Sequence, residues 1–258
     1  MSRAKTASRA RAKTEERTII DEALIPEDGI AFQRPPIKTK LRIKELAWTE
    51  KQRDFFRLAL DDDTNIMFVN GPAGTSKSLL AVYCGLKLLN YKKVSDLMYL
   101  RSAVESSDAK LGFLPGAAED KLAFYNLPFL DKLDELLTST NPEKLEKEKR
   151  ISMFPVNFAR GMSWNAKFII LDEAQNCTQK EITTVMTRLG PHSKLFILAD
   201  PMQTDLKNGS VGAFEKMFST FTDQESQSRG IHTFTFDEDD IMRSELVKYV
   251  TKKLKHIR

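Results

Sequence analysis

The sequence predicts an α/β protein in which helices cover both faces of a parallel sheet. Short apolar runs of strand length recur along the chain, and helical patterns separate most of them. One of these runs leads through a glycine-containing turn into a helix. Continuous apolar strands that alternate with helices are typical of a parallel sheet buried on both faces.

The expected elements can be placed in order along the chain. After an extended, proline-containing lead-in, Thr49 and Gln52 have the spacing of a capping box and predict the start of an amphipathic helix. The expected strands are 65–70, 97–101, 167–172, 194–199 and 231–236, and helical patterns between them include 78–90 and 180–190. The charged segment 138–150 is expected to be a surface helix or loop.

Length and composition fit a globular domain. The chain has 258 residues, of which 41% are hydrophobic, and this is enough for a buried core. No apolar run reaches the ~18 to 20 residues of a membrane span, and the first residues lack the apolar stretch of a secretory signal. We therefore expect a cytoplasmic protein without a membrane segment. Cys84 and Cys177 show no metal-binding spacing and are expected to be reduced structural thiols.

The positive charge is concentrated at the N-terminus. Residues 1–20 contain six Lys/Arg and two Asp/Glu, which leaves 34 of each sign in the rest of the chain. We expect residues 1–30 to be a basic, disordered tail and residues 31–258 to form the folded domain. Contact of the tail with a phosphate backbone and a solubilising or transit-type role are both open.

The stretch GPAGTSKS differs at one position from the phosphate-binding pattern G-x-x-x-x-G-K-[S/T], because Ser76 stands where the second glycine is usual. It lies between a strand and a helix, as a P-loop requires. Lys77 is expected to bridge the β- and γ-phosphates, and the Ser78 hydroxyl to bind Mg²⁺. Since serine is small, we expect the loop to survive with altered affinity. The residues expected to surround ATP phosphates are Gly71, Pro72, Ala73, Gly74, Thr75, Ser76, Lys77 and Ser78.

Acidic and amide side chains follow two later strands. Asp172 ends an apolar strand and is expected beside Mg²⁺, while Glu173 is expected to polarise a water for attack on the γ-phosphate. Asp200 and Gln203 follow the next strand, and Gln203 is a candidate for sensing the γ-phosphate. A simple turn built on Asp200 and Pro201 is the alternative.

With these motifs in order, the chain resembles the PhoH-like ATPases from about Gln52 to Leu246. The resemblance includes "LGFLPG", "DEAQN", "FARGMSW" and "DIMRSELV" besides the P-loop. It implies an ATPase core of RecA type, similar to the motor domain of superfamily 1 helicases, that acts on RNA or single-stranded nucleic acid. Departures from the family pattern include Ser76, Ser102 and Ser244.

The resemblance also assigns roles to single residues. Gln52 resembles the family's adenine-reading glutamine, Gln203 its phosphate-sensing glutamine, and Arg243 its late arginine. Arg101 heads the motif that lies near the bound strand in helicases, and Lys110 and Phe113 of the same segment are candidate strand contacts. For Phe113, stacking on a base and simple anchoring of its loop are both open.

The C-terminal segment raises the question of assembly. The residues after the P-loop suffice for one RecA-type domain, so an arginine finger is expected from another subunit. Arg243 is expected to act in trans in a homo-oligomeric ring, with a hexamer favoured, and an ion pair with Asp239 or Glu245 is the alternative. A helix over 243–258 is expected to have a basic face and one buried stripe, formed by Leu246, Val247, Val250 and Leu254.

Three functions follow from these patterns. The first is an oligomeric, Mg²⁺-dependent ATPase coupled to single-stranded RNA or DNA. A nucleotide-bound assembly scaffold with little turnover is the second, and Ser76 is its main support. A small-molecule P-loop kinase is the third, and it lacks the expected arginine-rich lid after the loop.

Overall fold

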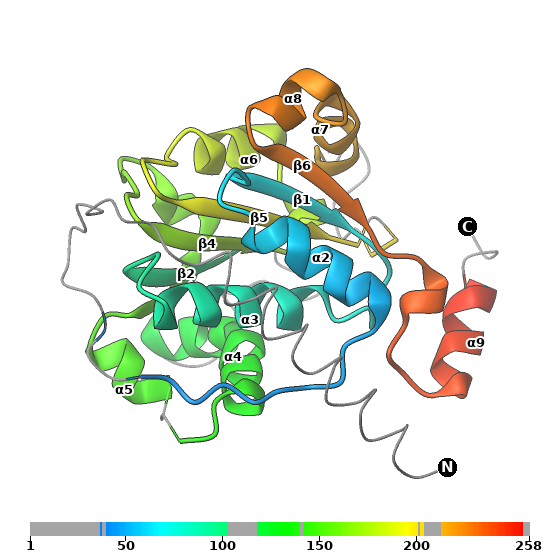
Figure 1. Ribbon diagram of the computed structural model, residues 1–258, viewed down its shortest axis with the longest axis horizontal. Coiled ribbons are helices and arrows are strands. Elements are labelled where there is room, and N and C mark those ends of the chain that lie inside the picture. The colour runs from blue at the N-terminus through cyan, green and yellow to red at the C-terminus, as the bar shows by residue number, and fades with distance from the viewer. Residues whose placement is uncertain are drawn as a thin grey trace, which may run out of the picture.

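A six-stranded parallel sheet forms the centre of the molecule, with the strand order β3-β2-β4-β5-β1-β6 (Figure 1). The computed structural model describes residues 37, 40–102, 118–139, 142–200, 202–203 and 213–254. The strands are β1 (Ile66–Asn70), β2 (Asp96–Arg101), β3 (Ile151–Pro155), β4 (Lys167–Asp172), β5 (Lys194–Ala199) and β6 (Ile231–Thr235). The predicted α/β fold with a parallel sheet is therefore confirmed.

Helices lie on both faces of this sheet (Figure 1). One face carries α2 (Glu50–Leu60), α3 (Lys77–Asn90), α4 (Ala118–Leu136) and α5 (Pro142–Lys147). The other face carries α6 (Gln179–Met186), α7 (Phe214–Thr220) and the 3₁₀ turn η2 (Val156–Ala159), while α8 (Gln224–Ser228) packs beside β6. Short 3₁₀ turns, η3 (Ala174–Asn176) and η4 (Glu238–Asp240), follow β4 and β6, and α9 (Glu245–Leu254) ends the described chain.

The strands supply alternate side chains to two hydrophobic cores. On β4, Phe168 and Ile170 point into the core beneath α3, whereas Ile169 and Leu171 point into the core beneath α6. All four side chains are fully buried, and burial of each such side chain contributes about 1.5–3 kcal/mol. Because both faces are covered, the strands read as continuous apolar runs rather than as alternating ones.

The predicted capping box at the start of α2 is confirmed. The Thr49 hydroxyl accepts a hydrogen bond from the Gln52 amide at 3.2 Å, and the Thr49 amide donates to Gln52 Oε1 at 3.0 Å. The helix then buries Phe55 and Phe56 against the sheet and α3. These contacts hold α2 beside the strand that leads into the P-loop.

Two features differ from the sequence prediction. Strand β3 was not predicted, because Ser152 and Pro155 interrupt its apolar character and it forms the edge of the sheet. The prediction of a buried stripe on the C-terminal helix was wrong: Leu246, Val247 and Val250 of α9 are 71%, 42% and 43% exposed. The described part of α9 stands beside the body of the domain instead of packing into its core (Figure 1).

The described residues also test two smaller expectations. Cys84 and Cys177 are buried free thiols, as predicted. The charged segment 138–150 contains the short helix α5, which is mostly exposed. Within the ranges given above, no helix is long and apolar enough to cross a lipid bilayer.

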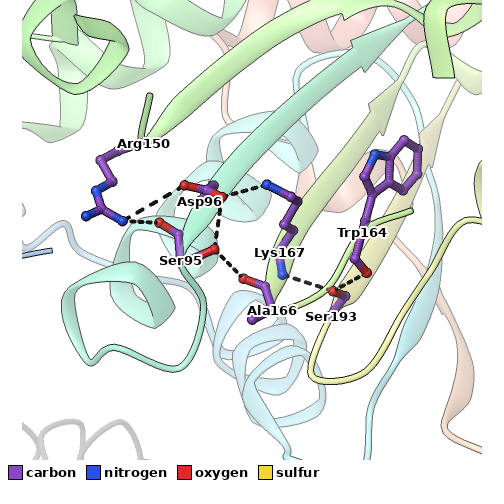
Figure 2. Close-up of polar contacts among 7 residues, drawn as sticks. All are labelled: Ser95, Asp96, Arg150, Trp164, Ala166, Lys167 and Ser193. Carbon is purple, nitrogen blue, oxygen red and sulfur yellow. Dashed lines mark hydrogen bonds and ion pairs between the residues drawn. The ribbon is translucent and has the colours of Figure 1, made fainter. Parts of the chain in front are cut away.

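A buried polar network closes the amino edge of the sheet (Figure 2). Lys167 Nζ at the start of β4 donates to Asp96 Oδ2 at the start of β2 over 2.6 Å, and Arg150 Nη1 lies 4.0 Å from Asp96 Oδ1. Ser95 Oγ bonds to both Asp96 Oδ2 and the Ala166 carbonyl, at 2.9 and 3.1 Å. Lys167 and Arg150 therefore share the Asp96 carboxylate as their counter-charge.

Candidate functional site

A cavity of about 460 Å³ opens at the opposite, carboxyl edge of the sheet. Strand β5 lies between β1 and β4, so the loop after β1 and the acidic pair after β4 flank the end of β5. Ligands of open α/β sheets gather at this edge. The cavity is lined from the P-loop, α4 and the segments after β4, β5 and β6 by Ala73, Gly74, Ser76, Lys77, Ser78, Leu79, Lys132, Glu135, Asp172, Glu173, Gln175, Ala199, Asp200, Gln203, Met242 and Arg243.

The P-loop has the tight backbone that its sequence predicts. Gly74 has φ 88° and Ser76 has φ 65°, both in the left-handed region that favours glycine. At Gly71 the need for glycine is steric, because a Cβ there would lie 2.8 Å from Phe236 Cβ. Thr75 Oγ1 donates to the Pro72 carbonyl at 2.9 Å. Ser76 therefore adopts the left-handed conformation for which glycine is usual at this position, although its Cβ makes that conformation less favourable.

Lys77 begins α3 and points back along the loop. Its Nζ donates to the carbonyls of Gly71 and Pro72 at 2.6 and 2.9 Å. Burial lowers the pKa of Lys77, and the nearby carboxylates of Asp200, Asp172 and Glu173 oppose this shift. The positive end of the 14-residue helix α3 lies at the same place, so this corner of the cavity suits an anion.

Asp172 is held by two hydrogen bonds at the end of β4. The Tyr99 hydroxyl donates to Asp172 Oδ2 at 2.7 Å, and the Glu173 amide donates to Oδ1 at 3.0 Å. Burial and the Asp172 charge raise the pKa of Tyr99 well above its ordinary value, so its hydroxyl keeps the donated proton. Asp172 and Ser78 offer hard oxygen donors of the kind that Mg²⁺ prefers, and both line the cavity beside the expected phosphates.

Glu173 has an environment suited to accepting a proton. Its backbone is left-handed, with φ 55°, which turns the chain sharply after Asp172. Burial, followed by the Asp172 charge, raises the pKa of Glu173. Arg101 Nη2 lies 3.7 Å from Glu173 Oε1. A carboxylate whose pKa is raised toward neutrality is a more effective general base.

Gln175 links the segments that follow β4 and β5. Its Nε2 donates to Glu173 Oε2 at 2.6 Å and to the Gln203 carbonyl at 3.1 Å, and its Oε1 accepts from the Asp200 amide at 3.1 Å. Sequence reasoning did not single out Gln175, and its only signal was a polar residue beside the acidic pair. The Asp200 carboxylate accepts from the Met202 amide at 3.0 Å, so the turn expected as an alternative role for Asp200 is also present.

Arg243 lies over the P-loop of its own chain. The Met242 amide donates to the Gly74 carbonyl at 2.9 Å, and a Cβ on Gly74 would lie 2.9 Å from Arg243 Cγ. Within the described part of the chain, no carboxylate lies within 4.0 Å of the Arg243 guanidinium, so the alternative ion pair with Asp239 or Glu245 is not formed. The sequence predicts a site in a neighbouring subunit for Arg243, whereas the structure places it in the cavity of the same chain.

The remaining predicted site residues have different positions. Gln52 is buried in α2, where its side chain caps the helix, and it does not line the cavity. Arg101 ends β2 beside Glu173. Lys110 and Phe113 lie outside the described residues. Lys132 and Glu135 of α4 line the cavity and were not predicted, because nothing in the sequence of α4 indicates which of its faces meets the P-loop.

Comparison with known proteins identifies similar chains. A family model described as PhoH-like protein matches residues 45–255. A PhoH-like protein of Mycobacterium tuberculosis (strain ATCC 25618 / H37Rv) is 34% identical over 192 residues, which cover 74% of this chain and 53% of that relative. A PhoH-like protein of Synechocystis sp. (strain PCC 6803) is 32% identical over 228 residues, which cover 88% and 67%. The chain thus spans about half the length of the mycobacterial relative.

Solved structures that match this chain include a helicase and an ATPase core. Pif1 helicase from Candida albicans is 17% identical, with a TM-score of 0.36 over 75% of this chain and 40% of that chain. The SWI2/SNF2 ATPase core of Sulfolobus solfataricus, solved in complex with double-stranded DNA, is 13% identical, with a TM-score of 0.42 over 76% and 46%.

Proposed function

Because this chain belongs to the PhoH-like protein family, we propose that it binds and hydrolyses ATP with Mg²⁺ in a cycle coupled to single-stranded RNA or DNA. The convergence of Lys77, Asp172 and Glu173 on one cavity supports ATP hydrolysis more than any other observation. Their motifs are about 95 residues apart along the chain and meet because β5 alone separates β1 from β4.

The residues around the cavity divide the work of phosphoryl transfer. Lys77 and the amino end of α3 bind phosphate oxygens, while Ser78 and Asp172 would hold Mg²⁺. The ion, when bound, supplies positive charge to the phosphates. Tyr99 orients the Asp172 carboxylate through its hydrogen bond. Glu173 accepts the proton of the attacking water, and Gln203 contacts the γ-phosphate or that water.

Arg243 supplies a further positive charge in the cavity of its own chain. The contact of its side chain with Gly74 and the backbone hydrogen bond between Met242 and Gly74 support this role. Arginine that neutralises the developing charge on the phosphates raises transfer rates by ~10³ to 10⁵. Lys51 fixes the preceding turn by ion pairs with Asp237 and Asp240 at 3.1 and 3.4 Å, so this segment is tied to α2 as well as to the P-loop.

The test of hydrolysis is Glu173→Gln. Removing the general base is expected to lower phosphate release by ~10² to 10⁴ while ATP binding persists, because Gln occupies the same volume without accepting the proton. Phosphate release and binding of a fluorescent ATP analogue are measured for the variant and for Glu215→Gln, a matched change on the exposed surface of α7. If Glu173→Gln releases phosphate at the wild-type rate, Glu173 is not the general base.

Assembly into a ring of identical subunits, with a hexamer favoured, is the last part of the proposal. The exposed apolar side chains of α9, such as Leu246 and Tyr249, support contact with a second copy. Light scattering with and without ATP measures the mass. A monomer under both conditions would contradict this part and leave ATP hydrolysis untouched.

One observation favours a second candidate function, an assembly scaffold with little turnover. Ser76 holds φ 65° where glycine would be unstrained, and this strain lies directly at the phosphate-binding backbone. Assemblies that form with ATP but release no phosphate, with or without RNA, would identify the scaffold. Phosphate release that depends on Glu173 would exclude it.

A further inference from the structure

A second surface of interest follows β3 at the same edge of the sheet as the cavity. In the register of the sheet, Arg101 of β2 lies between Pro155 of β3 and Asp172 of β4. The chain after Pro155 forms η2 and the loop to β4, and it exposes several side chains. We call three of these, Phe158, Arg160 and Met162, the Phe158 surface. It begins one strand beyond Arg101.

The backbone that carries the Phe158 surface is firmly anchored. Val156, Ala159 and Trp164 are buried in the core beneath α6, and the Trp164 amide donates to the Arg188 carbonyl at 3.0 Å. Helix α6 packs against η2. Between these anchors Phe158 is 63% exposed and Met162 is 38% exposed. A fixed backbone therefore presents an aromatic and a thioether side chain to solvent.

The chain segment that carries this surface has no acidic residue. No Asp or Glu occurs in residues 151–171, whereas Arg160 lies at the centre of the exposed stretch. In the described part of the chain no carboxylate lies within 4.0 Å of the Arg160 guanidinium. Arg101, at the neighbouring strand end, forms a long ion pair with Glu173, with 3.7 Å between Nη2 and Oε1. The surface thus combines the exposed ring of Phe158 with Arg160, whose guanidinium has no carboxylate within 4.0 Å among the described residues.

An aromatic ring beside arginine is the chemistry that recognises single-stranded nucleic acid. Bases stack on exposed aromatic side chains whatever their sequence, and arginine binds the phosphates between them. Phe, Met and Arg are also enriched at protein interfaces, so a protein partner is the alternative outcome of the test below. We infer that the Phe158 surface binds single-stranded RNA or DNA by stacking on Phe158 and by phosphate contact with Arg160. This inference rests on the proposed coupling of ATP hydrolysis to such a strand.

The position of Arg101 gives the strand a route to the cavity. A strand that continues from Phe158 across the ends of β3 and β2 brings a phosphate to Arg101, where it competes with Glu173 for the guanidinium. Loss of this ion pair makes Glu173 Oε1 available to the attacking water, while Gln175 Nε2 still holds Oε2. Strand binding is therefore expected to raise the rate of phosphate release.

Direct binding tests the inference without ATP. Fluorescein-labelled oligo-U and oligo-dT of about 20 nucleotides are titrated with the full chain, and anisotropy gives the dissociation constants. Phe158→Ala is expected to weaken binding about tenfold, and Phe158→Tyr to retain it. Phe158→Leu should bind as weakly as Phe158→Ala, because leucine is apolar but cannot stack. Arg160→Gln is expected to lower the dependence of log Kd on log salt by about 1.

Leu127→Ala is the control, because Leu127 is an exposed apolar residue, 47%, on α4, which covers the other face of the sheet. It should bind both oligonucleotides as the wild type does, and thermal unfolding checks that every variant is folded. The inference is overturned if the wild type binds neither oligonucleotide, or if Phe158→Ala or Phe158→Leu binds as tightly as the wild type. A change in mass of Phe158→Ala without a change in strand affinity would instead assign this surface to a protein contact.

ATP turnover measured in parallel separates this inference from the proposed function. If the wild-type protein releases phosphate but binds neither oligonucleotide, the proposed role of the Phe158 surface is wrong and the proposed ATP hydrolysis is unaffected. Strand binding that depends on Phe158, without any phosphate release, supports nucleic-acid binding by the Phe158 surface and contradicts the proposed ATP hydrolysis. If oligo-U binds and oligo-dT does not, or the reverse, the strand class is identified.

Discussion

The two ends of the β2–β4 strand pair carry charged residues in the same register but in opposite surroundings. At the amino end Asp96 is paired with Lys167, and at the carboxyl end Arg101 is paired with Asp172 in the sheet. The Asp96–Lys167 ion pair is 2.6 Å long, and its side chains are 3% and 14% exposed (Figure 2). Arg101 instead reaches Glu173 over 3.7 Å, and Glu173 lines the cavity. The buried, short ion pair at the amino end stabilises the sheet. The longer ion pair at the carboxyl end lies beside the cavity, where a ligand can replace one of its partners.

Left-handed backbone conformations, unlike the ion pairs, do not distinguish the two edges of the sheet. At the carboxyl edge Ser76 and Glu173 have positive φ, but Ala166 and His192, which precede β4 and β5 at the amino edge, also have positive φ, 51° and 58°. A left-handed residue marks a sharp turn at either edge. The functional edge is distinguished by the convergence of Lys77 with several carboxylates on one cavity.

Asp172→Asn gives the largest effect that this comparison predicts. Loss of the carboxylate is expected to lower phosphate release about 10³-fold, because the site loses a metal ligand. Stability should change by no more than about 1 kcal/mol, since removal of this charge also relieves its repulsion of Glu173. Phosphate release and urea unfolding measure the two effects. A large loss of stability with normal turnover would show that Asp172 has the structural role assigned here to Asp96.

Asp96→Ala is the converse change at the amino edge. It leaves Lys167 and Arg150 partly buried without their carboxylate, and the expected loss of unfolding free energy is about 3 kcal/mol. Urea unfolding measures it, and turnover per folded molecule should stay near the wild-type value. Glu225→Ala removes the acid of an exposed pair with Arg229 and should cost less than about 1 kcal/mol. Equal losses in the two variants would contradict a structural role for the buried network.

The parts of the fold and site that the sequence predicts are those set by local pattern. Strands β1, β4 and β5 are buried along nearly their whole length, so apolar runs such as 167–172 identify them. The capping box at Thr49 and the P-loop follow from short spacings. Lys77 and Asp172 could be placed together because parallel strands bring their carboxyl ends to one edge.

The parts that the sequence did not predict depend on contacts between distant segments. Tyr99 reaches Asp172 only through the register of β2 and β4, and Gln175 reaches Gln203 only once β4 and β5 are adjacent. The place of Arg243 depends on a turn that returns the chain to Gly74. The amphipathic pattern of α9 indicates that an apolar face exists, but it does not specify whether the same chain covers it.

Ser76→Gly gives the smallest predicted effect and tests whether strain at the functional edge differs from strain elsewhere. Ser76 precedes α3 with φ 65° and Lys92 follows it with φ 64°, so Lys92→Gly is a matched control. Each change should raise the unfolding free energy by about 0.5–1 kcal/mol, because glycine adopts this conformation without the Cβ penalty. Thermal unfolding and ATP titration measure both variants. Only Ser76→Gly should bind ATP more tightly, since its amide lies at the phosphate-binding end of α3, and an equal change in Lys92→Gly would show that loop strain does not control affinity.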